Sequence, residues 1–255
     1  KIEISDVRRQ SRVSRAFDEI GEMLAAMTEN CKGQEKDSQN SCDEFAERIR
    51  AVSAGKSEEA FVDRLISFYC YEIEKAWMDR VAEVVGYAEN AGLNAIVNIH
   101  HDGADSSYWL NIKEAAKSES KNTAVKSELE AIWTQIAERF KDKGNFLAFE
   151  SMNEIHDGGW GWGENRTDGG KQYAVLNEWN QVFVNAVRAV GGENADRFLG
   201  VPGYCTNPEL TISSFKLPTD KVQNRLMVAV HFYDPYEYTL NAAYSEWGHT
   251  GAAGK

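Results

Sequence analysis

The sequence predicts an α/β fold in which helices alternate with parallel strands, as in a (β/α)8 TIM barrel. Three observations lead to this prediction. Helical and strand periodicities alternate from about residue 72 onward. The strands are continuous apolar runs, which is typical of parallel sheets. Polar side chains follow these strands at their C-terminal ends, where the active sites of parallel barrels lie.

The expected elements follow one another in strict alternation. Each long helix is predicted from apolar side chains that recur every three or four residues, and a glycine follows its end. The predicted helices cover residues 73–88, 125–140 and 176–190, with a short helix near 207–215. The predicted strands cover residues 93–100, 145–152, 197–201 and 226–231.

An open doubly wound sheet is the alternative to a barrel. No glycine-rich phosphate loop follows any predicted strand, which disfavours the nucleotide-binding form of that fold. In a barrel, the C-terminal ends of all strands converge on one mouth. The polar groups at these ends are His100-His101-Asp102, Asn153-Glu154, Tyr204-Cys205-Thr206-Asn207 and His231-Phe232-Tyr233. Four such groups favour the barrel.

Residues 1–70 differ from the rest of the chain. They are charged and helix-prone, they contain no clear strand, and three of the four cysteines lie there. We therefore predict two parts, a charged helical segment at 1–70 and a partial barrel domain at 71–255. The pairing of the cysteines is not fixed by their spacing.

Composition excludes several classes of partner. The net charge of -12 argues against binding to nucleic acid or to an anionic membrane surface. No apolar run reaches the length of about 18 residues that a membrane-spanning helix needs. No CxxC spacing occurs, so a zinc site is not expected. No cofactor is predicted.

Asn153 and Glu154 carry the predicted chemistry. Hydrolysis of a glycoside with retention needs two carboxyl groups about 5–5.5 Å apart, one an acid and one a nucleophile. An asparagine beside the acid can donate a hydrogen bond to the sugar hydroxyl next to the reacting carbon. An isolated Asn-Glu pair is usually a helix cap or a turn, but this pair follows a buried strand and lies among other polar strand ends. That placement favours the catalytic interpretation.

A metal site is the rival interpretation of the first polar group. His100, His101 and Asp102 are all residue types that bind metals. Adjacent residues of a strand point to opposite faces, so both histidines rarely bind the same ion. We therefore predict no metal.

Three motifs resemble consecutive signatures of glycoside hydrolase family 5, with its endoglucanase and xyloglucanase branch the most similar. They are Asn-Ile-His-His-Asp-Gly, Phe-Glu-Ser-Met-Asn-Glu-Ile-His-Asp and Val-His-Phe-Tyr-Asp-Pro-Tyr, and they keep the family's order and spacing. The resemblance covers roughly residues 71–248. It implies that family strands 3–6 are present, whereas strands 1–2 and 7–8 are not identifiable.

The resemblance also implies residue roles. Glu154 matches the family's general acid/base, and Asn153 matches its donor to the sugar hydroxyl. His100 and His101 match histidines that bind the sugar beside the scissile bond.

Aromatic residues and a second histidine complete the implied substrate site. His231 matches a histidine that supports the acid/base, and Tyr233 matches a tyrosine whose hydroxyl contacts the nucleophile. Trp109 is a candidate platform for sugar stacking, as are Trp160 and Trp162. These three are weaker candidates than the histidines, since a loop tryptophan can also serve only to pack its loop.

The family's nucleophile, a glutamate, has no identified counterpart. Glu246 is not assigned to that role, because no apolar strand precedes it. The resemblance still implies a retaining endo-β-1,4-glucanase acting on cellulose, xyloglucan, mannan or mixed-linkage glucan. The alternative is an inactive carbohydrate-binding remnant or one half of an assembled barrel.

Two further expectations concern assembly and location. A partial barrel leaves open sheet edges, which favour self-association. The family resemblance implies a secreted protein, extracellular or periplasmic, although no apolar signal region follows Lys1.

Overall fold

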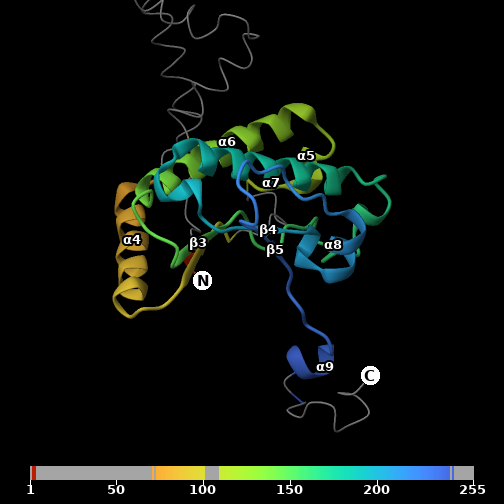
Figure 1. Cartoon of the computed structure of the whole chain (residues 1–255). Helices are drawn as coiled ribbons and strands as arrows, with labels where there is room; N and C mark the ends of the chain where they lie inside the picture. The colour runs from red at the N-terminus through yellow and green to blue at the C-terminus, as the bar shows by residue number, and fades with distance from the viewer. Residues whose placement is uncertain (1, 4–70, 72, 101–108, 242, 244–255) are drawn as a thin grey trace, which may run out of the picture.

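The computed structural model describes residues 2–3, 71, 73–100, 109–241 and 243. Within these residues five parallel strands form one sheet, drawn in Figure 1. The strands are β1 (Ile2–Glu3), β2 (Ala95–Asn98), β3 (Leu147–Glu150), β4 (Leu199–Pro202) and β5 (Leu226–Ala229). The α-helices are α4 (Lys75–Asn90), α5 (Ile112–Ala115), α6 (Glu119–Arg139), α7 (Lys171–Val190), α8 (Pro208–Ser214) and α9 (Tyr236–Thr239). Short 3-10 helices cover Glu164–Arg166, Gly192–Ala195 and Tyr204–Thr206.

The order of the strands distinguishes between the two predicted architectures. Each strand pairs in parallel with the next strand along the chain, in the order β1-β2-β3-β4-β5. A doubly wound sheet reverses its strand order at a switch point, whereas a barrel keeps consecutive strands adjacent. The sheet is therefore of the barrel type, although it is not closed. The predicted α/β class is confirmed.

Two short elements were missed by the sequence analysis. It found no strand in residues 1–70, but the structure places β1 at Ile2–Glu3, beside β2. It also did not anticipate α5, which is four residues long. Segments of this length are too short to produce a detectable periodicity.

Capping residues explain where several helices begin. The side chain of Asn111 accepts a hydrogen bond from the N–H of Glu114 at 3.1 Å. The side chain of Asn207 accepts one from the N–H of Leu210 at 3.0 Å, and a proline occupies the first turn of α8. Both arrangements satisfy N–H groups that a helix start leaves without partners.

The core lies between the sheet and helices α6 and α7, which cover the same side of the sheet in Figure 1. The ring of Trp133 packs edge-on against Phe183, with centroids 4.5 Å apart, and lies 5.4 Å from the ring of Phe149 on β3. All three side chains are fully buried. These aromatic contacts fix α6 and α7 over the strands that carry the candidate site.

The opposite face of the sheet is partly open. Ile96 of β2 is 41% exposed and Met227 of β5 is 37% exposed. In a closed barrel this face would be filled by side chains from all eight strands. In the described residues too few strands surround β5 to cover this face.

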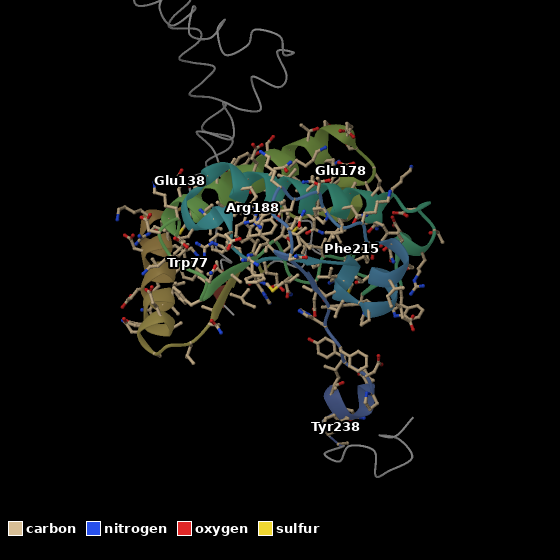
Figure 2. The ribbon with its side chains drawn as sticks, viewed as in Figure 1. Trp77, Glu138, Glu178, Arg188, Phe215 and Tyr238 are labelled. Carbon is tan, nitrogen blue, oxygen red and sulfur yellow. The ribbon has the colours of Figure 1, made fainter. Side chains whose placement is uncertain are left out.

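One helix stands apart from the layered body. Figure 2 shows side chains crowded between the helices and the sheet, whereas α9, with Tyr238, projects away from them. Of the helices that the structure describes, none combines the length and apolarity needed to cross a membrane.

Candidate active site

Glu154 lies in the loop that follows β3, and its side chain is 12% exposed. Three hydrogen bonds fix Ser151, which lies shortly before Glu154 in the chain. The N–H of Ser151 donates to the carbonyl of Gly200 at 2.9 Å, and the indole of Trp133 donates to the carbonyl of Ser151 at 3.1 Å. The hydroxyl of Ser151 donates to Asn180 at 2.7 Å. The sheet, α6 and α7 therefore fix the backbone that leads to Glu154.

A histidine and a tyrosine that follow β5 meet the carboxyl group of Glu154. Nδ1 of His231 forms a hydrogen bond with Oε1 of Glu154, although the two residues are 77 positions apart. The Tyr233 hydroxyl donates to the same oxygen at 3.5 Å. The N–H of His231 donates to the carbonyl of Thr206 at 2.8 Å, which ties this segment to the end of β4. The ends of β3 and β5 thus meet at the carboxyl group of Glu154, and the end of β4 holds the backbone of His231.

His231 and Tyr233 were both predicted from the sequence as residues of the substrate site, and both contact Glu154. His231 lies where a histidine that supports the acid/base would lie. The Tyr233 hydroxyl, predicted to contact the nucleophile, donates a hydrogen bond to Glu154 in the structure. Its contact with a nucleophile stays a prediction. Glu246, which was not assigned as the nucleophile, lies outside the described residues.

A second carboxyl group lies on the face of the sheet opposite the helices. Nδ2 of Asn98 donates to Oε2 of Glu150 at 2.8 Å and lies 3.5 Å from Nδ1 of His100. Asn98 and Glu150 are register partners on β2 and β3, so they share a face. Gly200 is next in register, and a Cβ there would lie 3.1 Å from the Cβ of Glu150. The glycine thus leaves room for the Glu150 side chain.

The sequence analysis missed Asn98 and Glu150. The available signal was a polar residue at the end of each of two apolar strands, at positions that pair in register. His100, which was predicted, lies within reach of this pair.

Trp109 does not offer a stacking surface in this structure. Only 6% of the residue is exposed, and it belongs to the hydrophobic core. It was predicted as a platform in the loop after His100-His101-Asp102, but Leu110 and Ile112 beside it are also buried. The predicted platform at Trp109 is corrected accordingly.

The other two predicted substrate-binding residues are Asn153 and His101. Asn153 is 3% exposed and directly precedes Glu154. His101 lies outside the described residues, as does Asp102. Among the residues that the structure describes, no group of three or more His, Cys, Asp or Glu side chains could hold a metal ion.

The loop between Glu154 and α7 is organised around Asp157. One carboxylate oxygen accepts from the N–H of Gly159 at 3.0 Å. The other accepts from the N–H of Asn165 at 3.0 Å and from the amide of Gln172 at 3.2 Å. Burial alone would raise the pKa of Asp157, but these three donors outweigh it and lower the pKa below its ordinary value.

This arrangement predicts a pH-dependent contribution to stability. Because the folded-state pKa of Asp157 is lowered, its contribution is present above the unfolded pKa of about 3.9 and is lost as the pH falls through the folded pKa. Asp157→Asn should be less stable than the parent at pH 7, and the difference should shrink below about pH 4. Urea denaturation across this range measures it. The exposed Asp142→Asn serves as control. A difference that stays constant down to pH 3 would contradict the assignment.

Comparison with known proteins relates this chain to cellulases and other β-glucanases. The sequence profile described as Cellulase (glycosyl hydrolase family 5) matches residues 33–253, which includes part of the segment set apart as residues 1–70. The chain is 41% identical to a xyloglucan-specific endo-β-1,4-glucanase of Bacteroides ovatus over 188 residues, 72% of this chain and 35% of that protein.

Solved structures of endoglucanases are similar to this chain as well. A GH5-4 broad specificity endoglucanase from Bacteroides salanitronis has 71% identity and a TM-score of 0.68, covering 71% of this chain and 48% of that one. A GH5-4 broad specificity endoglucanase from Ruminococcus champanellensis with bound cellotriose has 41% identity and a TM-score of 0.58, covering 68% and 47%. The chain spans about half the length of these relatives or less.

Proposed function

The chain belongs to glycosyl hydrolase family 5, the cellulase family, and on that premise we propose that it carries the acid/base half of a retaining endo-β-1,4-glucanase. The predicted family and the partial barrel of its fold class are thereby confirmed. The observation that supports the proposed function most directly is the convergence of Glu154, His231 and Tyr233 at the C-terminal ends of parallel strands. Active sites of barrel enzymes lie at this edge.

The geometry supports a specific role for Glu154. In a retaining reaction the acid protonates the leaving oxygen, and the same residue then accepts a proton from the attacking water. His231 and Tyr233 both contact Oε1 of Glu154, so they orient the carboxyl group. Asn153, next in the chain, is proposed to donate to the sugar hydroxyl beside the reacting carbon. His100 and His101 are proposed to bind the same sugar.

The proposed substrate is a β-1,4-linked glucan. The similar protein of Bacteroides ovatus is described as xyloglucan-specific, and the structure from Ruminococcus champanellensis holds cellotriose. Both names support a glucan backbone.

Product analysis tests this function. We expect the chain to release reducing ends from at least one of xyloglucan, carboxymethylcellulose or mixed-linkage glucan. Proton NMR of the first product should show the β-anomer, because two displacements at the anomeric carbon retain its configuration. An α-anomer as first product would overturn the retaining mechanism.

An inactive carbohydrate-binding remnant is the second candidate. The sheet is open in the described residues, and Ile96 and Met227 on its uncovered face are exposed. Binding to glucan without release of reducing ends would support this candidate and exclude the enzyme.

The open sheet also supports a proposal about assembly. We propose that β5, whose Val228 is 46% exposed, pairs with a second copy. Sedimentation velocity at increasing concentration tests it, and a monomer throughout would exclude it. A location outside the cell or in the periplasm is likewise proposed from the family, and fractionation of the source cells tests it.

A further inference from the structure

Asn98 is a polar residue at the buried end of an apolar strand. It is the last residue of β2, whose sequence is Ala-Ile-Val-Asn, and its side chain is fully buried. Burying an amide costs free energy unless the amide is hydrogen-bonded, so an apolar side chain would serve the packing of this strand better. The contacts of the amide therefore explain its presence.

The carboxylate of Glu150 determines which way this amide faces. Nδ2 of Asn98 lies 2.8 Å from Oε2 of Glu150, across the pairing of β2 with β3. An ionised carboxylate only accepts hydrogen bonds, so the amide nitrogen faces it and the amide oxygen does not. Gly200, the register partner of Glu150 on β4, leaves the space that the Glu150 side chain occupies, since a Cβ there would lie 3.2 Å from its Cγ. Three neighbouring strands thus fix the orientation of the amide.

The same amide nitrogen faces a ring nitrogen of His100. Nδ2 of Asn98 lies 3.5 Å from Nδ1 of His100, two residues further along the chain. A neutral imidazole carries its proton on one nitrogen and accepts a hydrogen bond at the other. At 3.5 Å the hydrogen bond is weak, but two N–H groups that faced each other would repel. The contact therefore favours the tautomer of His100 with its proton on Nε2.

We propose that Asn98 and Glu150 are positioning residues that hold His100 with its proton on Nε2. Glu150 orients the amide of Asn98, and this amide sets the tautomer of His100. The imidazole then presents its Nε2–H as a hydrogen-bond donor. On the proposed function, on which this last step rests, the donor binds a hydroxyl oxygen of the sugar.

Nitrogen NMR measures the tautomer directly. The two ring nitrogens of a neutral imidazole differ in chemical shift according to which of them carries the proton. A long-range proton–nitrogen correlation spectrum of the full chain, isotopically labelled in its five histidines, therefore identifies the tautomer of each. His100→Gln assigns the signals of His100 by their disappearance. The parent should show His100 with its proton on Nε2, at a pH at which the ring is neutral.

Two substitutions change the group that faces Nδ1 of His100. Asn98→Asp replaces the amide by a carboxyl group of the same shape, which can accept a hydrogen bond, so Nδ1 should become protonated. Glu150→Gln replaces a pure acceptor by an amide that also donates, so the amide of Asn98 can turn and offer its oxygen to His100. His100 should then become a mixture of both tautomers.

Each variant has a matched control on the helices that cover the other face of the sheet. Asn185→Asp makes the same substitution at an exposed position of α7, and Glu138→Gln makes the other one on α6. Both controls should leave the His100 signals unchanged. Near-UV circular dichroism and the melting temperature establish that each variant folds. If Asn98→Asp does not fold, Glu150→Gln and the spectrum of the parent still decide.

Binding of cellotetraose connects the tautomer with the substrate. Isothermal titration in the Glu154→Gln background avoids turnover during the measurement. Adding Glu150→Gln should weaken binding about three- to tenfold, because the hydrogen bond from Nε2 of His100 is lost in part of the molecules. Adding Glu138→Gln should leave the dissociation constant unchanged.

The outcomes separate this proposal from the enzymatic one. A parent with the proton of His100 on Nδ1 overturns the proposal, and so do unchanged His100 signals in the folded variants; unchanged signals in Glu150→Gln alone overturn the role of Glu150. A shifted tautomer without weaker binding, or a parent that does not bind cellotetraose, overturns the donation to the sugar. Hydrolysis with an unchanged tautomer overturns the positioning of His100 alone. A shifted tautomer in a chain that never releases reducing ends upholds the positioning and overturns the enzymatic function.

Discussion

Glu154→Gln is expected to lower kcat/KM on soluble β-glucans by about 100- to 10,000-fold, the range that general acid catalysis contributes. Glutamine matches the shape of glutamate and can keep a hydrogen bond with His231. It cannot deliver a proton to the leaving oxygen, so the loss should fall on the chemical step. Initial rates of reducing-end release measure the effect.

The nature of the leaving group distinguishes an acid from a merely structural residue. A dinitrophenyl β-cellobioside has a leaving group that departs without protonation, so Glu154→Gln should release the first dinitrophenolate at nearly the parental rate. Steady-state turnover should then be slow, because the general base that activates the attacking water is missing. Azide, which needs no base to attack, should restore turnover.

Glu138→Gln is the matched control for this experiment. Glu138 lies near the end of α6, its side chain is 53% exposed, and Figure 2 shows it on the helical layer. This variant should retain parental rates on both substrates. An equal loss on both substrates in Glu154→Gln, without rescue by azide, would contradict the acid/base role.

Arg197→Met is expected to lower the free energy of unfolding by about 3–4 kcal/mol, because several buried carbonyl groups lose a charged donor at once. The side chain of Arg197 donates five hydrogen bonds. One goes to the side chain of Asn194 at 2.8 Å. The others go to the carbonyl groups of Phe140, Lys143, Gly144 and Leu147.

This guanidinium joins three elements of the core. The carbonyl groups that it binds lie at the end of α6, in the following turn and at the start of β3, whereas Arg197 itself precedes β4. Only 1% of the residue is exposed, and burial lowers its pKa to about 10. The charge therefore remains at neutral pH, and the hydrogen bonds to it are charge-assisted.

Thermal and urea denaturation check the prediction. The melting temperature should fall by about 10 °C in a domain of this size. Arg197→Lys should recover only part of the loss, because a single ammonium cannot reach the same spread of acceptors. Arg225→Met should have a much smaller effect, since its ion pair with Asp196 is partly exposed. Parental stability in Arg197→Met would contradict the account.

The sequence determined the order of the elements and the position of the central residue. Apolar spacing within each segment is a local property, so it predicted α4, α6 and α7 and came close to where each of them ends. The structure begins α6 and α7 earlier, at Glu119 and Lys171. The strands β2, β3, β4 and β5 were found for the same reason, although each is shorter than expected. Glu154 was identified because it follows a buried strand within a motif that resembles family 5.

The contacts around Glu154 could not be read from local pattern. The meeting of Glu154 with His231 joins residues 77 positions apart and depends on the pairing of β3, β4 and β5. The pairing of Asn98 with Glu150 depends on the register of two strands, which nothing in either strand alone specifies.

Burial decided which tryptophans are available to a ligand. From the sequence, Trp109, Trp160 and Trp162 were all candidate stacking residues, because each lies in a loop after a polar strand end. Packing placed Trp109 in the core and left Trp162 75% exposed. Exposure depends on which distant segments cover a side chain. The sequence therefore determined which residues could act, and the packing of helices on the sheet decided which of them face solvent and which contact Glu154.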